Sequence, residues 1–177
     1  MTGVQTCALP ICFPVTIRPQ WLFDALDKEF HFTIDAACKE GNCKCPYGKF
    51  HEDIFGIGKK FDSLESTWIN QKDVGGNDLP SIIWLNPPYS KIKQFMKKAY
   101  EESLKGAVVV CLIPCRTDTR YWHDYVMKAH EIRLIKGRLK FGDSKGSAPF
   151  PSCIVIFDQS KYDKNNDPIF KTMENKQ

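Results

Sequence analysis

Apolar residues gather in four short runs along the chain. Ser81–Leu85 and Ala107–Ile113 are continuous apolar stretches, which is typical of strands covered on both faces. Two more runs, Glu131–Ile135 and Cys153–Phe157, complete the set. Because helical patterns lie between the earlier runs, the chain is predicted to be an α/β protein with a mostly parallel sheet. The last two runs are joined without a helix, which predicts an antiparallel pair at one edge of the sheet.

Three segments repeat their apolar residues at helical spacing. The first begins at Pro19, whose missing N–H costs nothing in the first turn of a helix. It leads into a short strand, Phe32–Ile34, which ends at Asp35. A second helix is expected after Ser90 and a third after Thr117–Thr119, with hydroxyl or carboxyl side chains as their N-caps.

The remaining segments carry weaker patterns. Lys39–Asp78 is rich in Gly, Lys, Asn and Asp, and only short strands near Tyr47 and Phe61 are suggested there. Met1–Ile11 fits no pattern and resembles translated sequencing adapter, so we interpret it as a non-native leader. We therefore expect one domain over residues 12–158 and a polar, frayed tail over residues 159–177.

Composition narrows the class of protein. Hydrophobic residues make up 42% and charged residues 26%, no apolar stretch is long enough to span a membrane, and no signal peptide is apparent. We expect a cytoplasmic monomer or weak homodimer whose eight cysteines are free thiols. Cys38, Cys43, Cys45 and His51 could form a zinc set, but their spacing lacks the paired C-x2-C of structural sites, so no metal is expected.

Positive charge is concentrated in residues 91–140. This block holds twelve Lys or Arg against five Asp or Glu, a net charge of +7, whereas the whole chain carries +4. Such asymmetry is typical of a surface that meets a polyanion, although solvated helix faces would give the same count. The candidate phosphate contacts are Lys91, Arg116 and Arg138.

The most informative motif is Asn86-Pro87-Pro88-Tyr89, which follows the apolar run Ser81–Leu85. Ligand sites of open α/β sheets lie at the carboxyl ends of strands. Two consecutive prolines make a rigid, extended turn whose carbonyls are expected to stay outside secondary structure. A proline-rich turn with no chemistry is the plain alternative.

This turn suits methylation of an exocyclic amine. The lone pair of adenine N6 is delocalised into the ring, so the nitrogen is a poor nucleophile. The Asn86 side-chain oxygen and the Pro87 carbonyl could accept its two N–H groups and stabilise the positive charge that develops on nitrogen. Tyr89 offers a ring on which a base turned out of the duplex can stack.

Several segments together carry a resemblance to a known family. They are PQWLFDALDKEFHFTIDAA, FDSLESTW, WLNPPYS, LIPCRTDTRYWHDYV, GRLKF and APFPSCIVIF. In this order they resemble the phage-type DNA N6-adenine methyltransferases, over about Pro19 to Phe157. The resemblance implies a Rossmann-like class I methyltransferase with an antiparallel last strand, a cofactor, S-adenosylmethionine, and double-stranded DNA as partner.

The resemblance also implies roles for particular residues. Asn86, Pro87, Pro88 and Tyr89 are expected to be catalytic, and Tyr89 to contact the base. The residues expected at the cofactor are Pro19, Asp35, Ala36, Asp62 and Asn86. Ala36-Ala37-Cys38 stands where methyltransferases at large have a glycine-rich loop.

Two other functions remain open at this stage. One is methylation of RNA or of a protein glutamine, since both present a planar amino group to the same turn. The other is a non-enzymatic DNA-binding relative of the fold, although its Asn-Pro-Pro-Tyr turn would then have no purpose.

Overall fold

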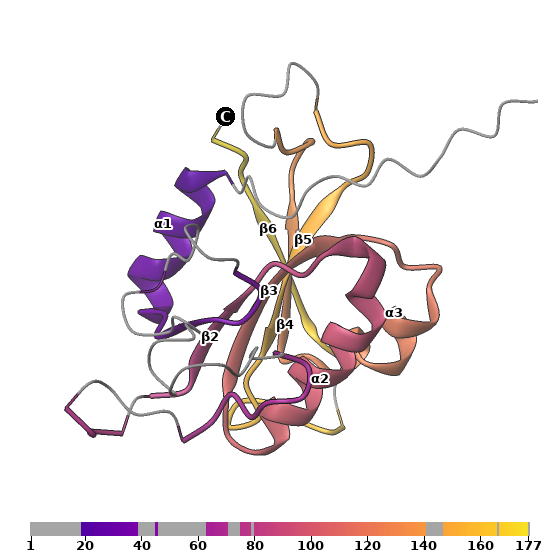
Figure 1. The fold of residues 1–177 in the computed structure, drawn as a ribbon. Helices are drawn as coiled ribbons and strands as arrows, with labels where there is room; N and C mark the ends of the chain where they lie inside the picture. Colours follow the sequence, from indigo (N-terminus) through magenta and orange to yellow (C-terminus); the bar gives the residue numbers. More distant parts are fainter. Residues whose placement is uncertain are drawn as a thin grey trace, which may run out of the picture.

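A computed structural model describes residues 19–38, 45, 63–70, 75–78, 80–140, 147–165 and 167–176. Helices cover both faces of a central sheet: α1 lies on one face, and α2 and α3 lie on the other (Figure 1). The helices and strands, with the two short 3-10 turns η1 and η2, are α1 (Gln20–Phe30), β1 (Ile34–Asp35), β2 (Ile82–Leu85), η1 (Tyr89–Lys91), α2 (Ile92–Leu104), β3 (Val108–Pro114), α3 (Arg120–Asp124), η2 (Val126–Lys128), β4 (Glu131–Ile135), β5 (Ser152–Phe157) and β6 (Ile169–Met173).

The sheet has the strand order β1-β2-β3-β5-β4-β6. β1, β2 and β3 are mutually parallel, β5 runs antiparallel to both β3 and β4, and β6 runs parallel to β4. Among the strands that the structure describes, five therefore point the same way and only β5 is reversed. As a result, the residues that follow β1, β2, β3 and β4, and those that precede β5, all lie at one edge of the sheet.

The core is divided by the sheet into two layers. One layer packs under α2 and α3 around fully buried residues such as Met96, Val109 and Ile132. The other packs under α1 around Leu22, Leu26 and Trp84. Side chains that alternate along β3 enter opposite layers, as the pleat of a strand requires.

A charged pair fastens α1 to the sheet. Arg133 of β4 donates two hydrogen bonds to the carboxylate of Glu29, Nη1 to Oε2 and Nη2 to Oε1, each of 2.6 Å. Its Nε also donates to Glu131, which accepts a second bond from Lys171 Nζ of β6 at 2.6 Å. The guanidinium fork matches a carboxylate in two places, so it fixes the helix in both position and angle.

A second network, on the other face, holds residues 63–70 against α2. The side chain of Glu102 is 0% exposed and accepts bonds from Lys98 Nζ at 2.7 Å and Lys105 Nζ at 2.8 Å. Its second oxygen accepts the Trp68 amide at 2.9 Å. The Trp68 indole N–H donates to the carbonyl of Ser63 at 2.8 Å, so one buried carboxylate organises the whole segment.

The α/β class and its mostly parallel sheet are confirmed, and the helices and strands lie close to the predicted ranges. The antiparallel pair β4–β5 is also present, but β6 continues the sheet beyond β4. The expectation of a frayed tail is therefore wrong for Ile169–Met173. Backbone pairing to β4 holds this segment in the sheet although four of its five residues are exposed. The short run Ile-Phe-Lys-Thr-Met does not have the continuous apolar pattern of a buried strand.

The predicted helix caps are wrong in detail. The helix expected after Ser90 starts with the 3-10 turn η1, and Lys91 stands at the N-cap of α2 without a side-chain bond. Thr119 does stand at the N-cap of α3, but its hydroxyl donates to the Arg116 carbonyl instead of accepting a helix N–H. The leader Met1–Ile11 and the strands suggested near Tyr47 and Phe61 lie outside the described residues.

Candidate active site at the carboxyl edge of the sheet

The Asn86-Pro87-Pro88-Tyr89 turn leaves the end of β2 at the edge where the parallel strands finish. Asn86 is 7% exposed, yet neither its side chain nor the Pro87 carbonyl is hydrogen-bonded to another described residue. Pro88 differs, because its carbonyl accepts the Lys91 amide at 2.9 Å within η1. The expectation that both proline carbonyls stay outside secondary structure is wrong for Pro88, and the pair of available acceptors is Asn86 and Pro87.

The end of β1 lies beside this turn. Asp35 is opposite Trp84 in the parallel register, and the Ala36 amide donates to the Trp84 carbonyl at 3.0 Å. The Asp35 side chain is 0% exposed, and its Oδ1 lies 3.4 Å from the Ala37 amide. Two buried polar side chains, those of Asp35 and Asn86, therefore end adjacent strands at the same edge.

Residues 63–70 close over the end of β1. The Ser63 hydroxyl donates to the Ala36 carbonyl at 2.5 Å, and the Ser63 carbonyl is held in turn by the buried Trp68 indole. This contact gives residues 63–68 of the FDSLESTW motif a structural role next to Asp35. Asp62, expected at the cofactor, lies outside the described residues.

Tyr89 meets an aromatic residue that was not selected from the sequence. Its ring and that of Phe150 are 5.1 Å apart between centroids and inclined at 82°, an edge-to-face contact. The Arg116 guanidinium carbon lies 5.8 Å from the centroid of the same Phe150 ring. Burial raises the pKa of Tyr89 to about 12, so its hydroxyl stays protonated throughout the neutral range. Phe150 stands between two prolines just before β5, and that aromatic residue in a loop could have been noticed in the sequence.

Backbone pairing sets this arrangement. Pro114 at the end of β3 is opposite Ser152 at the start of β5. The ladder continues one residue further, because the Cys115 amide donates to the Pro151 carbonyl at 2.9 Å. Arg116 and Phe150 are therefore brought together by the β3–β5 pair, although 34 positions separate them in the chain.

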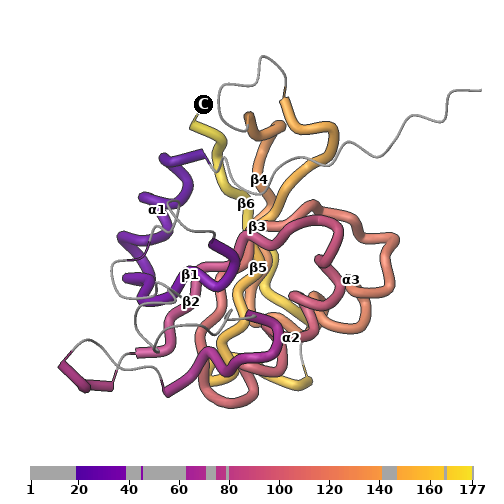
Figure 2. The backbone as a smooth tube through the Cα atoms, viewed as in Figure 1, coloured from indigo at the N-terminus to yellow at the C-terminus, as the bar shows by residue number. Residues whose placement is uncertain are grey.

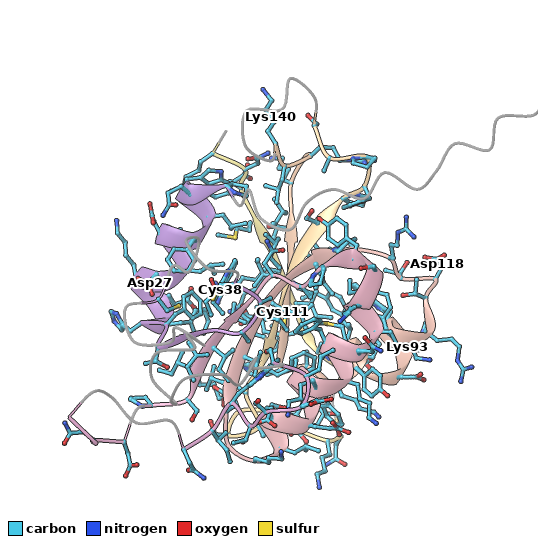
Figure 3. All side chains as sticks on the ribbon, in the orientation of Figure 1. Asp27, Cys38, Lys93, Cys111, Asp118 and Lys140 are labelled. Atoms are coloured by element: carbon cyan, nitrogen blue, oxygen red, sulfur yellow. The ribbon has the colours of Figure 1, made fainter. Side chains whose placement is uncertain are left out.

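The basic block divides into two groups in the structure. Lys98, Lys105 and Arg133 are bound to carboxylates within the fold. By contrast, the three candidate phosphate contacts are exposed and form no ion pair within the described part of the chain: Lys91, Arg116 and Arg138. Each follows the end of a parallel strand, β2, β3 or β4. Figure 3 shows Asp118 and Lys140 on two of the loops that leave this edge, after β3 and after β4.

Arg138 and Pro19 lie at the margins of this region. Arg138 Nη1 donates to the Ala148 carbonyl at 3.3 Å, which links the loop after β4 to the segment before β5. Pro19 is buried at the start of α1, where its carbonyl accepts the Leu22 amide at 3.0 Å. Their roles toward DNA and cofactor stay predictions.

The expectation that all cysteines are free thiols is wrong for Cys38. Among the cysteines that the structure describes, Cys38 is disulfide-bonded, whereas Cys45, Cys111, Cys115 and Cys153 form no disulfide. The expectation of free thiols rested on a reducing cytoplasmic compartment and on a hydrophobic core large enough to fold without disulfides. The size of the core shows only that a disulfide is not needed for stability. Within the described residues, no group of three or more His, Cys, Asp or Glu side chains is arranged to hold a metal. Cys43 and His51 of the proposed zinc set are not among those residues.

The architecture and the site together define a class. A mostly parallel sheet with one reversed strand beside β3 and an Asn-Pro-Pro-Tyr turn at its carboxyl edge is compatible with a Rossmann-like methyltransferase fold (Figure 2). The family model of the DNA N-6-adenine-methyltransferases (Dam) matches residues 16–175. The chain belongs to this family.

A phage protein shows the same relationship. The DNA N-6-adenine-methyltransferase of Escherichia phage T1 is 30% identical over 108 residues, which cover 61% of this chain and 38% of the phage protein. The chain thus spans well under half of the relative's length. No helix in the described ranges is long and apolar enough to cross a membrane.

Proposed function

We propose that this chain transfers a methyl group from S-adenosylmethionine to the exocyclic N6 of an adenine in double-stranded DNA. The observation that carries the proposal is the pair of acceptors at the end of β2. Asn86 is almost completely buried, and its side chain and the adjacent Pro87 carbonyl have no hydrogen-bond partner among the described residues. A planar amino group, with two N–H donors, is the ligand that such a pair accepts.

The residues at the end of β1 fit the cofactor. Asp35 presents a buried carboxylate, which can accept hydrogen bonds from the amine or hydroxyl groups of S-adenosylmethionine. Ala36 and Ala37 are small, so a ligand can approach the backbone closely there. When bound, the cofactor supplies an activated methyl group on a sulfonium. Asp35 and Asn86 end neighbouring strands, and this adjacency would bring donor and acceptor together.

The protein's own contribution is then positional and electrostatic. Asn86 and the Pro87 carbonyl bind the two amino hydrogens and turn the nitrogen lone pair toward the methyl donor. The same fixed dipoles stabilise the positive charge that develops on N6, without reorganisation. The two prolines hold the acceptors still. The proton released from the nitrogen leaves to solvent after transfer.

The target base must leave the helical stack to reach this turn. The base can stack on the ring of Tyr89, and the edge-to-face contact with Phe150 fixes the orientation of that ring. Lys91, Arg116 and Arg138 are placed to bind phosphates around the opening, since they follow strands that end at this edge and carry no ion pair within the described residues. A cytoplasmic protein, monomeric or weakly dimeric, would suit this role, and these remain proposals.

The test is methylation by the purified chain with labelled S-adenosylmethionine, offered duplex DNA, RNA of the same sequence and a glutamine peptide in parallel. We expect label only in duplex DNA, recovered as N6-methyl-2′-deoxyadenosine on nucleoside analysis. Label in RNA or in the peptide would show that this molecule, and not duplex DNA, is a substrate. No label on any substrate, together with no heat of cofactor binding in calorimetry, would favour a non-enzymatic relative.

Asn86→Ala tests the mechanism. Loss of one acceptor in a preorganised site costs about 10²–10³ in turnover. Asn86→Asp keeps an acceptor oxygen of the same size and should retain more activity. Ser90→Ala, an exposed position in η1, is the matched control. Calorimetric affinity for S-adenosylmethionine in every variant separates loss of chemistry from loss of cofactor. Near wild-type turnover in a folded Asn86→Ala protein would refute the role of Asn86.

A further inference from the structure

Two cysteines face each other beneath the loops of the site. Cys153 is opposite Ile113 in the antiparallel register of β3 and β5, and the Cys115 amide bonds the Pro151 carbonyl. Residues two positions apart share a face of a strand, so Cys115 and Cys153 are diagonal neighbours on one face. Both pack against the same hydrophobic core cluster, and each thiol changes the pKa of the other.

The two thiols differ in chemistry. Cys153 is 0% exposed, whereas Cys115 is only partly buried, at the edge of the core. The interaction with Cys153 lowers the pKa of Cys115 to about 7, and the same interaction together with burial raises the pKa of Cys153. A substantial fraction of Cys115 is therefore thiolate near neutral pH, at a position that solvent can reach, with Cys153 as its neighbour on the adjacent strand.

A third cysteine on the same face provides an internal comparison. Cys111 lies two strand repeats from Cys115, near the centre of the sheet (Figure 3), and is 0% exposed. Burial raises the pKa of its thiol well above the ordinary value. Cys111 should thus stay unreactive while the fold is intact.

We propose that Cys115 is a site of reversible thiol oxidation by low-molecular-weight disulfides, with Cys153 as the resolving thiol. The Cys115 thiolate attacks one sulfur of the small disulfide R–S–S–R, forming a mixed disulfide and releasing one thiolate RS⁻. Cys153 then loses its proton and attacks the Cys115 sulfur, which forms the Cys115–Cys153 bond and releases a second RS⁻. Two electrons pass from the protein to the small disulfide, which is reduced to two thiols.

The consequence for the site follows from position. Bond formation joins the sulfurs at about 2.05 Å, and because diagonal neighbours are about 7–8 Å apart, it requires the two strand ends to move toward each other. The new link joins the two strand ends that carry Arg116 and Phe150, whose contact is described above. Displacements of about 1 Å in a positioned site can cost as much as 10²-fold in rate. This part of the inference rests on the proposed function; formation of the bond does not.

The bond itself is tested by treating the folded full chain with oxidised glutathione and digesting it with trypsin. The tryptic peptide 106–116 holds Cys111 and Cys115, and the tryptic peptide 146–161 holds Cys153, so a crosslink between them is visible by mass. We expect the crosslink in the wild type. In Cys153→Ser the glutathione adduct should persist on Cys115, and in Cys115→Ser neither peptide should be modified. A crosslink through Cys111, found by fragmentation, or no crosslink in a folded protein, would overturn the proposal.

The effect on function is measured separately on the same samples. DNA affinity of the oxidised protein should fall about 10-fold and recover with dithiothreitol, whereas Cys115→Ser should bind DNA equally before and after oxidation. Cys111→Ala serves as the matched control and should respond like the wild type. A crosslinked protein with unchanged DNA affinity would refute the coupling to the site. If the chain did not bind DNA in any form, the proposed function would fail while the peptide map still reported on the thiols.

Discussion

Removal of the buried Glu102 carboxylate should destabilise the described fold strongly. Glu102→Ala leaves the buried Trp68 amide without its acceptor at 2.9 Å and the Lys98 ammonium, whose side chain is 13% exposed, without its counter-ion. Hydrogen bonds to charged groups contribute about 1.5–3 kcal/mol each. Lys105 is 49% exposed, so its bond adds little. Breaking a buried ion pair in other proteins costs about 3–5 kcal/mol, so we expect a loss of about 3 kcal/mol.

The assay is thermal unfolding of three variants. A loss of about 3 kcal/mol in a domain of this size corresponds to a fall in Tm of roughly 10 °C. Glu102→Gln keeps the shape and an acceptor for the Trp68 amide, so its Tm should lie between those of the alanine variant and the wild type. Glu101→Ala is the matched control: its pair with Lys97 is exposed, and its effect should stay within about 0.5 kcal/mol.

The same substitution should reach the cofactor end of the site. The Glu102 carboxylate accepts the Trp68 amide, the Trp68 indole N–H donates to the Ser63 carbonyl, and the Ser63 hydroxyl donates to the Ala36 carbonyl. Below its Tm, Glu102→Ala should therefore bind S-adenosylmethionine more weakly in calorimetry, with Glu101→Ala unchanged. A Tm for Glu102→Ala within about 2 °C of the control would refute the energetic argument, because a loss of about 3 kcal/mol in unfolding free energy should lower Tm by more than that.

Three further predictions follow from the structure. Burial raises the pKa of Glu102 and of Glu131, but hydrogen bonds from lysine and arginine outweigh it and place both below 4.5. Each carboxylate therefore contributes stability that is complete above about pH 4.5 and is lost as the pH falls through the folded-state pKa; Tm measured from pH 7 to 3 should show this loss, and less of it in Glu102→Gln. Tyr89→Ala should weaken capture of the target base, seen as reduced 2-aminopurine fluorescence change on binding, while Tyr89→Phe retains it; equal responses would exclude stacking. Removal of a true phosphate contact should reduce the magnitude of the slope of log DNA-binding constant against log salt concentration by about one unit. The variants to measure replace Lys91, Arg116 or Arg138 by alanine, with Lys97→Ala as the control.

Local sequence pattern determined most of the secondary structure. Continuous apolar runs predicted β2, β3 and β5, since strands buried on both faces have no polar side to display. The Asn-Pro-Pro-Tyr turn was recognisable at the end of such a run because proline geometry is a property of the residue itself. Caps were predicted less well, because Ser90 and Thr119 have local alternatives for their hydroxyl groups that sequence does not rank.

Only the tertiary structure decided which distant residues meet. β5 lies between β3 and β4, and this pairing brings Phe150 to Tyr89 and Cys153 to Cys115. β6 joins the sheet through backbone hydrogen bonds, which any sequence can supply, and its apolar residues Ile169 and Phe170 remain exposed, so it lacks the buried pattern by which the other strands were predicted. The sequence does not distinguish the buried Glu102 from a surface glutamate. Its contact with Trp68 and its burial, which strengthens its bonds to Lys98 and Lys105, arise only when the chain packs. Residue type and spacing determine what a segment can form, whereas pairing across the sheet determines what each side chain contacts.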